Sequence, residues 1–266
     1  MDDPTKDLFF VTISTQANRS KFINSCESFV ARYGLDGIDI DMEYPAAMER
    51  GGPATDTPRL TAFFKEAKAG LSGKIVSVAA PASYWFLTGF EIDKVVNHVD
   101  YMNMMSYDFH GAWDNDVADE DATAKPHTSS VDIMDAISLY TRAKVDLSKV
   151  NLSMAWCWRT YAVGSCKGMG CKVYQRSLAG FTQLSGLSQF TTGGKAGKCT
   201  GEFSIKSQTE IWDEIKTGGI KPTYDSKSNT YWYNKDNDFV TYDDVNSWNH
   251  KTDIAGKYCF GGTFVW

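Results

Sequence analysis

The chain has 266 residues, which is long enough for one large domain or two small ones. A formal net charge of −6 argues against a nucleic-acid partner, because surfaces that follow phosphates are basic. No apolar run of about eighteen residues is present, so neither a membrane span nor a membrane partner is expected.

Helical and strand-like segments alternate along the chain, which is typical of a parallel α/β fold. The first helix is expected at 19–33, where apolar residues recur at helical spacing. The second, at 58–71, opens at a proline. The other expected elements are an acidic strand at 36–43, strands at 74–80 and 99–107, a polar loop at 108–128, a helix at 129–143, and strands at 150–156 and 258–266.

The segment 36–45, with the sequence DGIDIDMEYP, is the most informative part of the chain. Asp39, Asp41 and Glu43 alternate with two isoleucines and a methionine, a period of two that predicts a β-strand with one acidic face. Three carboxylates in a row on an inner face are unfavourable unless they share protons, form hydrogen bonds or bind a ligand. Tyr44-Pro45 ends the strand, which places Glu43 at the tip where α/β barrels carry their chemistry.

Two other interpretations of this segment exist. Carboxylates at alternate positions also occur in calcium and magnesium loops, but those loops need a central glycine and have few apolar residues between ligands. A solvated acidic strand face without a role is the second alternative. The position of Glu43 at the strand end favours a functional site over both, and we expect no metal ion and no cofactor.

The pattern D-G-x-D-x-D-x-E followed by Y-P resembles the signature of glycoside hydrolase family 18, the chitinases, on barrel strand four. The resemblance implies that Glu43 is the general acid, that Asp41 orients the substrate acetamide, and that Asp39 supports Asp41. In this family the substrate's own 2-acetamido oxygen attacks C1 and gives an oxazolinium intermediate. A neighbouring carboxylate then offsets the developing positive charge.

Further segments match the family in chain order. Residues 79–85 resemble the end of barrel strand five, and 104–111, MMSYDFHG, resemble its M-T-Y-D-x-H-G element on strand six. The segment 261–266 resembles strand eight, whose tryptophan forms the floor beneath the reacting sugar. Tyr107 is expected to act with the acids as a donor to the acetamide oxygen. The resemblance implies that the substrate-binding residues are Tyr44, Ala80, Met105, Asp108, Arg159 and Trp266.

The chain departs from the family at strand seven, where W-C-W-R at 156–159 replaces the usual Y-G-R. Arg159 is retained, but one substrate contact is lost with the tyrosine, and a tryptophan in place of glycine would block or reshape a subsite. Met42 stands where the family usually has Trp, and its side chain is expected to face the helices. Because sugar rings stack on aromatic faces, some of the following are expected to line a saccharide cleft: Trp85, Trp113, Trp156, Trp158 and Trp232.

About a hundred residues separate strands seven and eight, far more than an ordinary connection. The segment 166–244 contains an expected helix at 209–216 and strand-like runs at 230–233 and 239–242. It resembles the α+β insertion of one branch of these chitinases. Its cysteine-containing stretches and the C-F-G-G ending at 259–262 are most similar to the fungal killer-toxin-like chitinases.

Six cysteines point to an oxidising compartment. Cys166, Cys171 and Cys199 lie in a Gly- and Lys-rich segment that a disulfide would staple, although spacing fixes no pairing. Cys26 and Cys157 fall in an expected helix and strand and are candidates for free buried thiols. With the family resemblance, these cysteines imply a secreted protein, whose signal peptide would lie upstream of this chain.

The resemblance implies an α/β fold, a (β/α)8 TIM barrel with the α+β insertion between strands seven and eight. It begins near Leu8, so that residues 1–266 form a partial catalytic domain in which strands one to three have no counterpart. Such an N-terminally incomplete barrel would leave strands four and eight with unpaired edges. We therefore expect a fragment that aggregates or stays partly unfolded when isolated.

The resemblance predicts a retaining chitinase, endo- or exo-acting, that cleaves β-1,4-N-acetylglucosamine linkages. Its partners would be chitin or N-acetylglucosamine oligosaccharides, and the full-length protein would be monomeric. One alternative is a non-catalytic chitin-binding or killer-toxin-like component, but chitinase-like lectins typically lose the acid that Glu43 supplies. Another is an endo-β-N-acetylglucosaminidase, which shares the acid motif; the killer-toxin-like cysteines argue against it.

Overall fold

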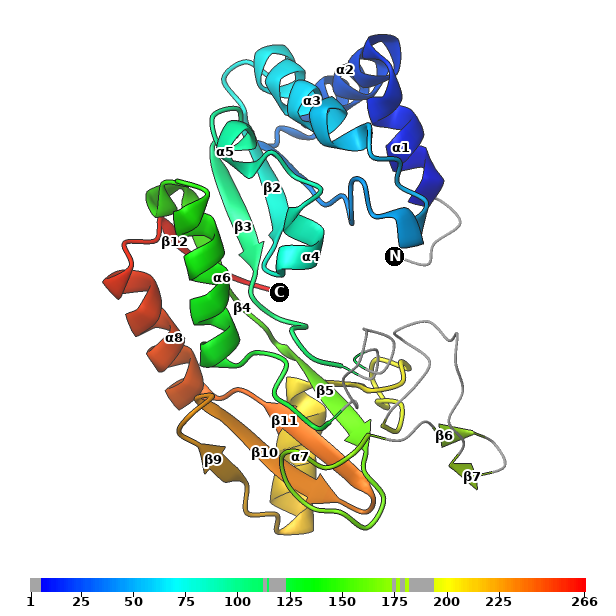
Figure 1. The fold of residues 1–266 in the computed structure, drawn as a ribbon, viewed down its shortest axis with the longest axis vertical. Coiled ribbons are helices and arrows are strands. Elements are labelled where there is room, and N and C mark those ends of the chain that lie inside the picture. Colours follow the sequence, from blue (N-terminus) through cyan, green and yellow to red (C-terminus); the bar gives the residue numbers. More distant parts are fainter. Residues whose placement is uncertain (1–5, 112–113, 115–122, 174–175, 178–179, 182–193) are drawn as a thin grey trace. The chain divides into compact units, whose positions relative to one another are not determined.

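The structure is a computed structural model that describes residues 6–111, 114, 123–173, 176–177, 180–181 and 194–266 (Figure 1). Tertiary contacts divide the chain into two compact units. Unit 1 comprises Met1–Met105, Asp135–Ser153 and Ala255–Phe264. Unit 2 comprises Ser106–Met134, Met154–Ile254 and Val265–Trp266.

A five-stranded sheet carries most of unit 1. Its strands are β1 (Gly37–Ile40), β2 (Ile75–Pro81), β3 (Tyr101–Met105), β4 (Val150–Met154) and β12 (Gly262–Val265), hydrogen-bonded in the order β1-β2-β3-β4-β12. The pairs β1–β2, β2–β3 and β3–β4 are parallel, which confirms the α/β organisation expected from the sequence. Within the described part of the chain, β1 and β12 are the two edges of this sheet.

The helices and helical turns that precede β3 are α1 (Lys6–Ser14), α2 (Gln16–Tyr33), η1 (Met48–Arg50), α3 (Asp56–Gly70), α4 (Tyr84–Leu87) and α5 (Ile92–Val95). Those that follow it are α6 (Ser130–Arg142), η3 (Leu147–Lys149), α7 (Gln208–Gly218) and α8 (Val245–Lys257). The helices α1, α2 and α3 pack against one another, as the blue and cyan ribbons of Figure 1 show.

The helix α2 begins before position 19 because Thr15 caps it, the threonine side chain accepting a hydrogen bond from the Asn18 N–H. It ends at Gly34, whose φ of 65° is the left-handed conformation that commonly closes a helix. The sequence pattern does not anticipate α1, because its segment KDLFFVTIS is rich in aromatic and β-branched residues that favour a strand.

The strand β1 ends earlier than the sequence pattern predicts. Its ladder with β2 begins at Gly37 and stops at Ile40. Met42 is buried, as expected, but Asp41 and Glu43 lie beyond the strand rather than on its face. A strand through position 43 is therefore wrong. Beyond the end of the strand, the side chains of Asp41 and Glu43 form a hydrogen bond with each other.

Unit 2 contains a second five-stranded sheet, in which each pair of neighbouring described strands is antiparallel. Its order is β8 (Ile205–Ser207), β5 (Cys157–Ala162), β11 (Asp238–Tyr242), β10 (Thr230–Lys235) and β9 (Thr223–Asp225). A short pair, β6 (Arg176–Ser177) and β7 (Gly180–Phe181), lies outside it. The expected helix and both strand-like runs at 166–244 are present, but β5 shows that the sheet also uses residues before 166. The insertion boundaries stay a prediction.

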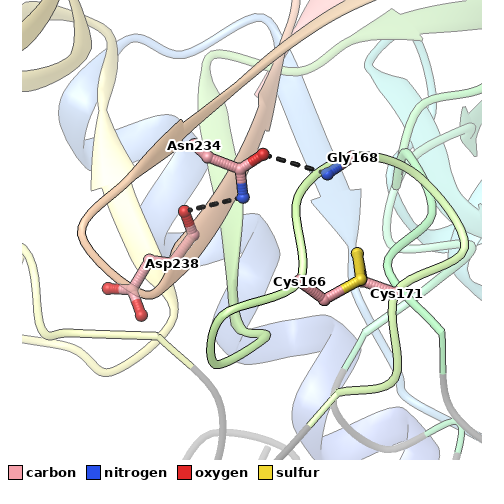
Figure 2. Close-up of a disulfide and its surroundings, with 5 residues drawn as sticks. All are labelled: Cys166, Gly168, Cys171, Asn234 and Asp238. Carbon is pink, nitrogen blue, oxygen red and sulfur yellow. Dashed lines mark hydrogen bonds between the residues drawn. A yellow bond between two sulfur atoms is a disulfide. The ribbon is translucent and has the colours of Figure 1, made fainter.

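A disulfide closes a short loop after β5. Cys166 and Cys171 are bonded, while Cys26, Cys157, Cys199 and Cys259 are free. Figure 2 shows Asn234 beside this loop, its Oδ1 accepting a hydrogen bond from the Gly168 N–H at 3.0 Å. Its Nδ2 donates to the backbone oxygen of Asp238 at 3.3 Å, so one side chain ties the loop to the β10–β11 hairpin.

Candidate active site

Asp39 on β1 is held by side chains of the adjacent strand β2 and of β3 beyond it. Its Oδ1 accepts hydrogen bonds from Ser77 Oγ at 2.5 Å and from Asn103 Nδ2 at 2.9 Å. Asn103 Oδ1 accepts in turn from Asn151 Nδ2 at 3.0 Å. Because Asp39 pairs in register with Ser77, and the two asparagines pair likewise, one polar line crosses the sheet from β1 to β4. This line fixes the Asp39 carboxylate.

Asp41 and Glu43 form an interacting pair of carboxyl groups just beyond β1. Burial of Asp41, the charge and hydrogen bond of Glu43, and the charge of Asp39 raise the pKa of Asp41 to about 6. The Oδ1 atom of Asp41 is buried and has no hydrogen-bond partner within the described residues. A carboxyl group with this pKa exchanges a proton near neutral pH. The pair can therefore hold the kind of proton that acid catalysis requires.

Arg50 is an ionic partner of Glu43, and the sequence pattern did not reveal it. Its Nη1 lies 3.9 Å from Glu43 Oε2, and its guanidinium lies over the Tyr44 ring at 5.2 Å from the centroid. Burial, followed by the charge of Glu43, raises the pKa of Tyr44, so the phenol stays neutral. Arg50 follows the acidic motif at a distance set by an irregular turn, and no periodicity connects it to Glu43.

Ala80 and Met105 lie near the C-terminal ends of β2 and β3. Ala80 is fully buried, and Met105 is also buried. Pro81, which follows Ala80, pairs in register with Met105 and accepts a hydrogen bond from the Tyr140 hydroxyl at 2.9 Å. The strand ends are thereby anchored to α6. The contact of Ala80 and Met105 with a substrate stays a prediction.

In unit 2, Tyr107 and Trp266 present nearly parallel rings, with centroids 6.4 Å apart and planes 8° apart. The backbone of Trp266 is fixed by two hydrogen bonds, from its N–H to the Met154 oxygen at 3.1 Å and from the Trp156 N–H to its oxygen at 2.8 Å. Its side chain is 63% exposed. Two aromatic residues that are distant in the sequence thus meet and offer a ring face to solvent.

Asp108 is the centre of a charged cluster in unit 2. Arg159 donates to both carboxylate oxygens, from Nε to Oδ1 at 2.7 Å and from Nη2 to Oδ2 at 2.5 Å. Burial opposes ionisation of Asp108, but the Arg159 charge and the hydrogen bonds of His127 and Arg159 hold its pKa well below its usual range. The carboxylate is therefore ionised throughout the neutral range, and the arginine retained at strand seven has a defined partner.

His127 is a further partner of Asp108 that the sequence pattern did not reveal. Its Nδ1 lies 3.2 Å from Asp108 Oδ1, and its backbone oxygen accepts from the Phe109 N–H at 3.1 Å. The ring is fully buried, and burial lowers the pKa of His127. It thus holds the segment after Tyr107 at two points. His127 falls in the expected polar loop, where no spacing or periodicity marks a single histidine.

Trp156 and Trp158, which the family resemblance assigned to barrel strand seven, take two different positions. Trp158 is fully buried in a core cluster with Ile211, Tyr233, Val240 and Tyr242. Successive side chains of a strand alternate between its faces, so Trp158 packs the core on the face opposite Arg159 rather than projecting from the surface. Trp156 is 53% exposed and packs against Trp248, with the two ring centroids 5.7 Å apart. Trp232 is partly buried and packs against a second core cluster of unit 2, which includes Tyr161 and Phe239. Trp113 lies outside the described residues.

His110, in the motif of 104–111, lies between two carboxylates of unit 2. Its Nδ1 is 3.0 Å from Asp114 Oδ2, and its Nε2 is 3.5 Å from Asp132 Oδ2. Burial lowers the pKa of His110, but the hydrogen bonds and charges of both aspartates prevail and raise it to about 9. The imidazole is therefore charged at neutral pH. The Tyr161 hydroxyl donates to the His110 backbone oxygen at 2.9 Å.

Among the residues that the structure describes, no three His, Cys, Asp or Glu side chains are grouped to hold a metal ion. No described helix is long and apolar enough to cross a membrane.

Comparison with known proteins agrees with these motifs. The model of the glycosyl hydrolases family 18 matches residues 2–266. The killer toxin subunits alpha/beta of Kluyveromyces lactis are 32% identical over 98% of this chain, which spans 22% of that protein. The probable chitinase LysM11 of Penicillium expansum is 30% identical over 82% of this chain, which spans 20% of it. The chain thus spans about a fifth of the length of these relatives.

A solved structure shares the fold. Catalytic domain 2 of the group II chitinase of Ostrinia furnacalis matches with a TM-score of 0.80 over 96% of this chain and 65% of that one. The two sequences are 22% identical, so the likeness concerns the fold alone. The matched part of this chain includes both the parallel sheet of unit 1 and the antiparallel sheet of unit 2.

Proposed function

The chain belongs to family 18 of the glycosyl hydrolases, and we propose that it is the catalytic part of a chitinase. Its reaction is hydrolysis of β-1,4 linkages between N-acetylglucosamine residues. The observation that carries the proposal is the pair of Asp41 and Glu43, in which burial and the Glu43 charge raise the pKa of Asp41 to about 6. The word chitinase in the names of similar proteins supports the substrate class. In this proposal, the parallel five-stranded sheet of unit 1 is part of a (β/α)8 barrel.

In the proposed reaction, Glu43 passes the proton that it shares with Asp41 to the leaving glycosidic oxygen as a general acid, which leaves Asp41 ionised. The 2-acetamido oxygen of the substrate attacks C1 as the glycosidic bond breaks and forms an oxazolinium ring. The carboxylate of Asp41 accepts a hydrogen bond from the acetamide N–H and offsets the positive charge of the oxazolinium ring. Glu43 then takes a proton from the water that opens the ring, so that the configuration at C1 is retained. Asp39, fixed by Ser77 and Asn103, keeps Asp41 oriented.

The residues of unit 2 receive binding roles. Tyr107 donates a hydrogen bond to the acetamide oxygen, and the exposed ring of Trp266 supports the reacting sugar. Asp108 contacts the substrate as an ionised carboxylate, and the buried Arg159 acts through Asp108 by fixing both of its oxygens. Three residues of unit 1 complete the proposed binding set: Tyr44, Ala80 and Met105.

Hydrolysis of a fluorogenic chitotrioside tests the proposal, with Glu43→Gln beside the wild-type chain. The variant keeps the size of the side chain but lacks a transferable proton, so turnover should fall roughly 10²–10⁴-fold. Glu91→Gln is the matched control, because Glu91 lies in unit 1 and pairs with Lys94 on the surface. Equal activity of Glu43→Gln and wild type would contradict the acid role.

The same assay separates the other candidates. Binding of chitotriose without hydrolysis would identify a lectin, and cleavage of high-mannose N-glycans in place of chitin would identify an endo-β-N-acetylglucosaminidase. The products released from chitohexaose would distinguish internal from end-wise cleavage. We also propose that the protein is secreted and acts as a monomer on chitin, and the Cys166–Cys171 disulfide supports an oxidising compartment.

A further inference from the structure

Arg50 lies in a short turn that hydrogen bonds and close packing hold in one conformation. Around η1, the N–H groups of Arg50 and Gly52 both donate to the Ala47 oxygen at 2.9 Å. Gly51 closes the turn with a φ of 85°, a left-handed conformation that glycine adopts without strain. A Cβ at Gly52 would lie 3.1 Å from the Phe10 ring of α1, so the turn fits tightly against that helix. The backbone of Arg50 is therefore fixed within unit 1.

The side chain of Arg50 lies against a pair of stacked aromatic rings. Its guanidinium is 5.2 Å from the centroid of the Tyr44 ring and 5.3 Å from that of Phe86, and the two centroids are 3.9 Å apart. Aromatic faces attract a cation, so both rings help to hold the guanidinium. The Arg50 side chain is only 19% exposed, and solvent therefore screens its charge less than that of a surface arginine. The charge has a set place beside the residue that follows Glu43.

The distance between Arg50 and Glu43 distinguishes this pair from a salt bridge that locks a carboxylate. Arg50 Nη1 lies 3.9 Å from Glu43 Oε2, and the Glu43 side chain is 25% exposed. Arg159, by contrast, donates hydrogen bonds of 2.5 and 2.7 Å to Asp108, and such contacts hold a carboxyl group in its ionised form. At 3.9 Å a cation favours the ionised form of Glu43 without a hydrogen bond. Glu43 therefore stays able to carry a proton and to release it.

Most of the other charged or titratable groups beside this site are acids. They are Asp39 on β1, Tyr44 after Glu43, Glu49 on η1 and Asp7 on α1, whose carboxyl lies 4.0 Å from the point where a Cβ on Gly51 would be. Glu49 accepts a hydrogen bond from the indole N–H of Trp85, a residue that is 67% exposed, at 2.8 Å. The charge of Asp39 acts on Asp41. Arg50 thus brings a positive charge to a group of carboxylates.

We propose that Arg50 assists cleavage of the glycosidic bond by stabilising the carboxylate that Glu43 becomes after it has given its proton to the leaving oxygen. The inference rests on the proposed function, because it concerns the same reaction. In this role Arg50 acts through Glu43, so it is a positioning residue and not a catalytic one.

The charge balance of the two steps explains why a cation at this place matters. Before cleavage, Asp41 and Glu43 share one proton and carry one negative charge. The proton then moves to the leaving oxygen, which also takes the electron pair of the glycosidic bond, and both carboxyl groups are ionised beside the oxazolinium ring. A cation that interacts more strongly with this second state lowers the barrier to the first step. When water opens the ring and Glu43 regains a proton, the same charge opposes that transfer.

The pH dependence of kcat/KM for chitotetraose tests this role in Arg50→Met, which keeps an extended side chain against the rings but removes its charge. Without the cation the carboxyl pair holds its proton more tightly, so both limbs of the profile should move to higher pH by roughly half to one unit. The value at the wild-type optimum should fall roughly five- to tenfold. Arg50→Lys keeps the charge and should restore most of both. Arg32→Met is the matched control, because it removes the same charge from unit 1 and its guanidinium also lies over a ring, that of Tyr33, at 5.4 Å.

A second substrate identifies the step that Arg50 assists. The fluorogenic chitotrioside releases a phenol, whose anion is a better leaving group than that of a sugar, so its cleavage depends less on the acid. Arg50→Met should therefore lose no more than about twofold on this substrate. A loss confined to chitotetraose would place the effect of the charge in proton transfer to the leaving oxygen.

The outcomes separate this inference from the proposed function. Unmoved pH limbs and equal losses on the two substrates in Arg50→Met would overturn the inference and leave the proposed function standing. A loss in Arg50→Lys as large as that in Arg50→Met would also overturn it, because shape and not charge would then matter. A wild-type chain that hydrolyses neither substrate would overturn the proposed function and the inference with it. Circular dichroism verifies the fold of each variant, and Arg50→Gln, which also removes the charge, replaces Arg50→Met if that variant does not fold.

Discussion

Two aspartates, Asp41 of unit 1 and Asp108 of unit 2, lie in opposite electrostatic environments. Asp41 in unit 1 is surrounded by carboxylates, and burial together with the charge of Glu43 raises its pKa to about 6. Asp108 in unit 2 is paired with Arg159 and His127, which overcome burial and hold its pKa well below its usual range. Because burial raises the pKa in both places, the charge of the neighbours decides the outcome. One group can bind a proton near neutral pH, whereas the other serves as a fixed anion.

Asp108→Asn is the strongest way to break this comparison. The change leaves the guanidinium of Arg159, which is 5% exposed, without its charged partner. Loss of one partner of a fully buried pair costs about 3–5 kcal/mol, and exposure of about a third of the Asp108 side chain reduces the expected loss to about 2–3 kcal/mol. Urea-induced unfolding would measure it. Asp236→Asn is the control, because its pair with Lys195 is exposed and should contribute less than about 1 kcal/mol. Equal losses in the two variants would contradict a buried charge centre.

His110 extends the comparison to a cation held by two carboxylates. Because hydrogen bonds and charges of Asp114 and Asp132 overcome burial, the pKa of His110 is raised from 6.5 to about 9. The folded state therefore binds this proton more tightly, so the stabilisation is complete below about pH 6.5 and is lost as the pH rises through about 9. With allowance for the 21% exposure of its side chain, unfolding free energies measured from pH 6 to 10 should fall by about 2 kcal/mol. His110→Gln should remove that decrease; an unchanged decrease would contradict the assignment.

Asp41 should give a smaller decrease in a different pH window. Burial and the Glu43 charge raise its pKa from 3.8 to about 6, so the folded state again holds the proton more tightly than the unfolded state. Its favourable contribution is present below about pH 4 and is lost as the pH rises through about 6. After allowance for partial exposure, the loss is about 1–2 kcal/mol. Asp41→Asn should therefore be more stable than wild type at pH 8 and nearly equal at pH 4. Greater stability of wild type at pH 8 would contradict the sign.

The sequence predicted those features that depend on periodicity and on long motifs. The alternation of carboxylates with isoleucines identified β1 and the acids Asp39, Asp41 and Glu43, and the buried apolar run of β2 was anticipated to within a residue at each end. The end of β1 was not predicted, because a period of two continues in the sequence after the ladder stops at Ile40. Which carboxyl groups then meet depends on the backbone beyond the strand, which the pattern does not describe.

Residues that act through tertiary contacts were missed for the same reason. Arg50 and His127 each touch a proposed site residue, but each follows an irregular segment whose course depends on packing elsewhere. Trp158 was a candidate for lining the saccharide cleft, but it lies in a buried core cluster. The resemblance marks its position in the chain but not the side of β5 on which its side chain lies. A motif therefore specifies chemistry more reliably than it specifies the neighbours that adjust it.

Asn103→Ala gives the smallest and most specific test of the contrast between the two units. Asp39 is held by the neutral donors Ser77 and Asn103, whereas Asp108 is held by a guanidinium. Hydrogen bonds between neutral donors and a partly exposed acceptor contribute less than charged ones, so the variant should lose about 1 kcal/mol in urea-induced unfolding. Asn97→Ala is the control, because its side chain donates to the Asp93 backbone oxygen of α5 at an exposed position. A loss as large as that of Asp108→Asn would mean that Asp39 depends on its neighbours as strongly as a buried ion pair does, and the two acidic sites would then differ in charge but not in rigidity.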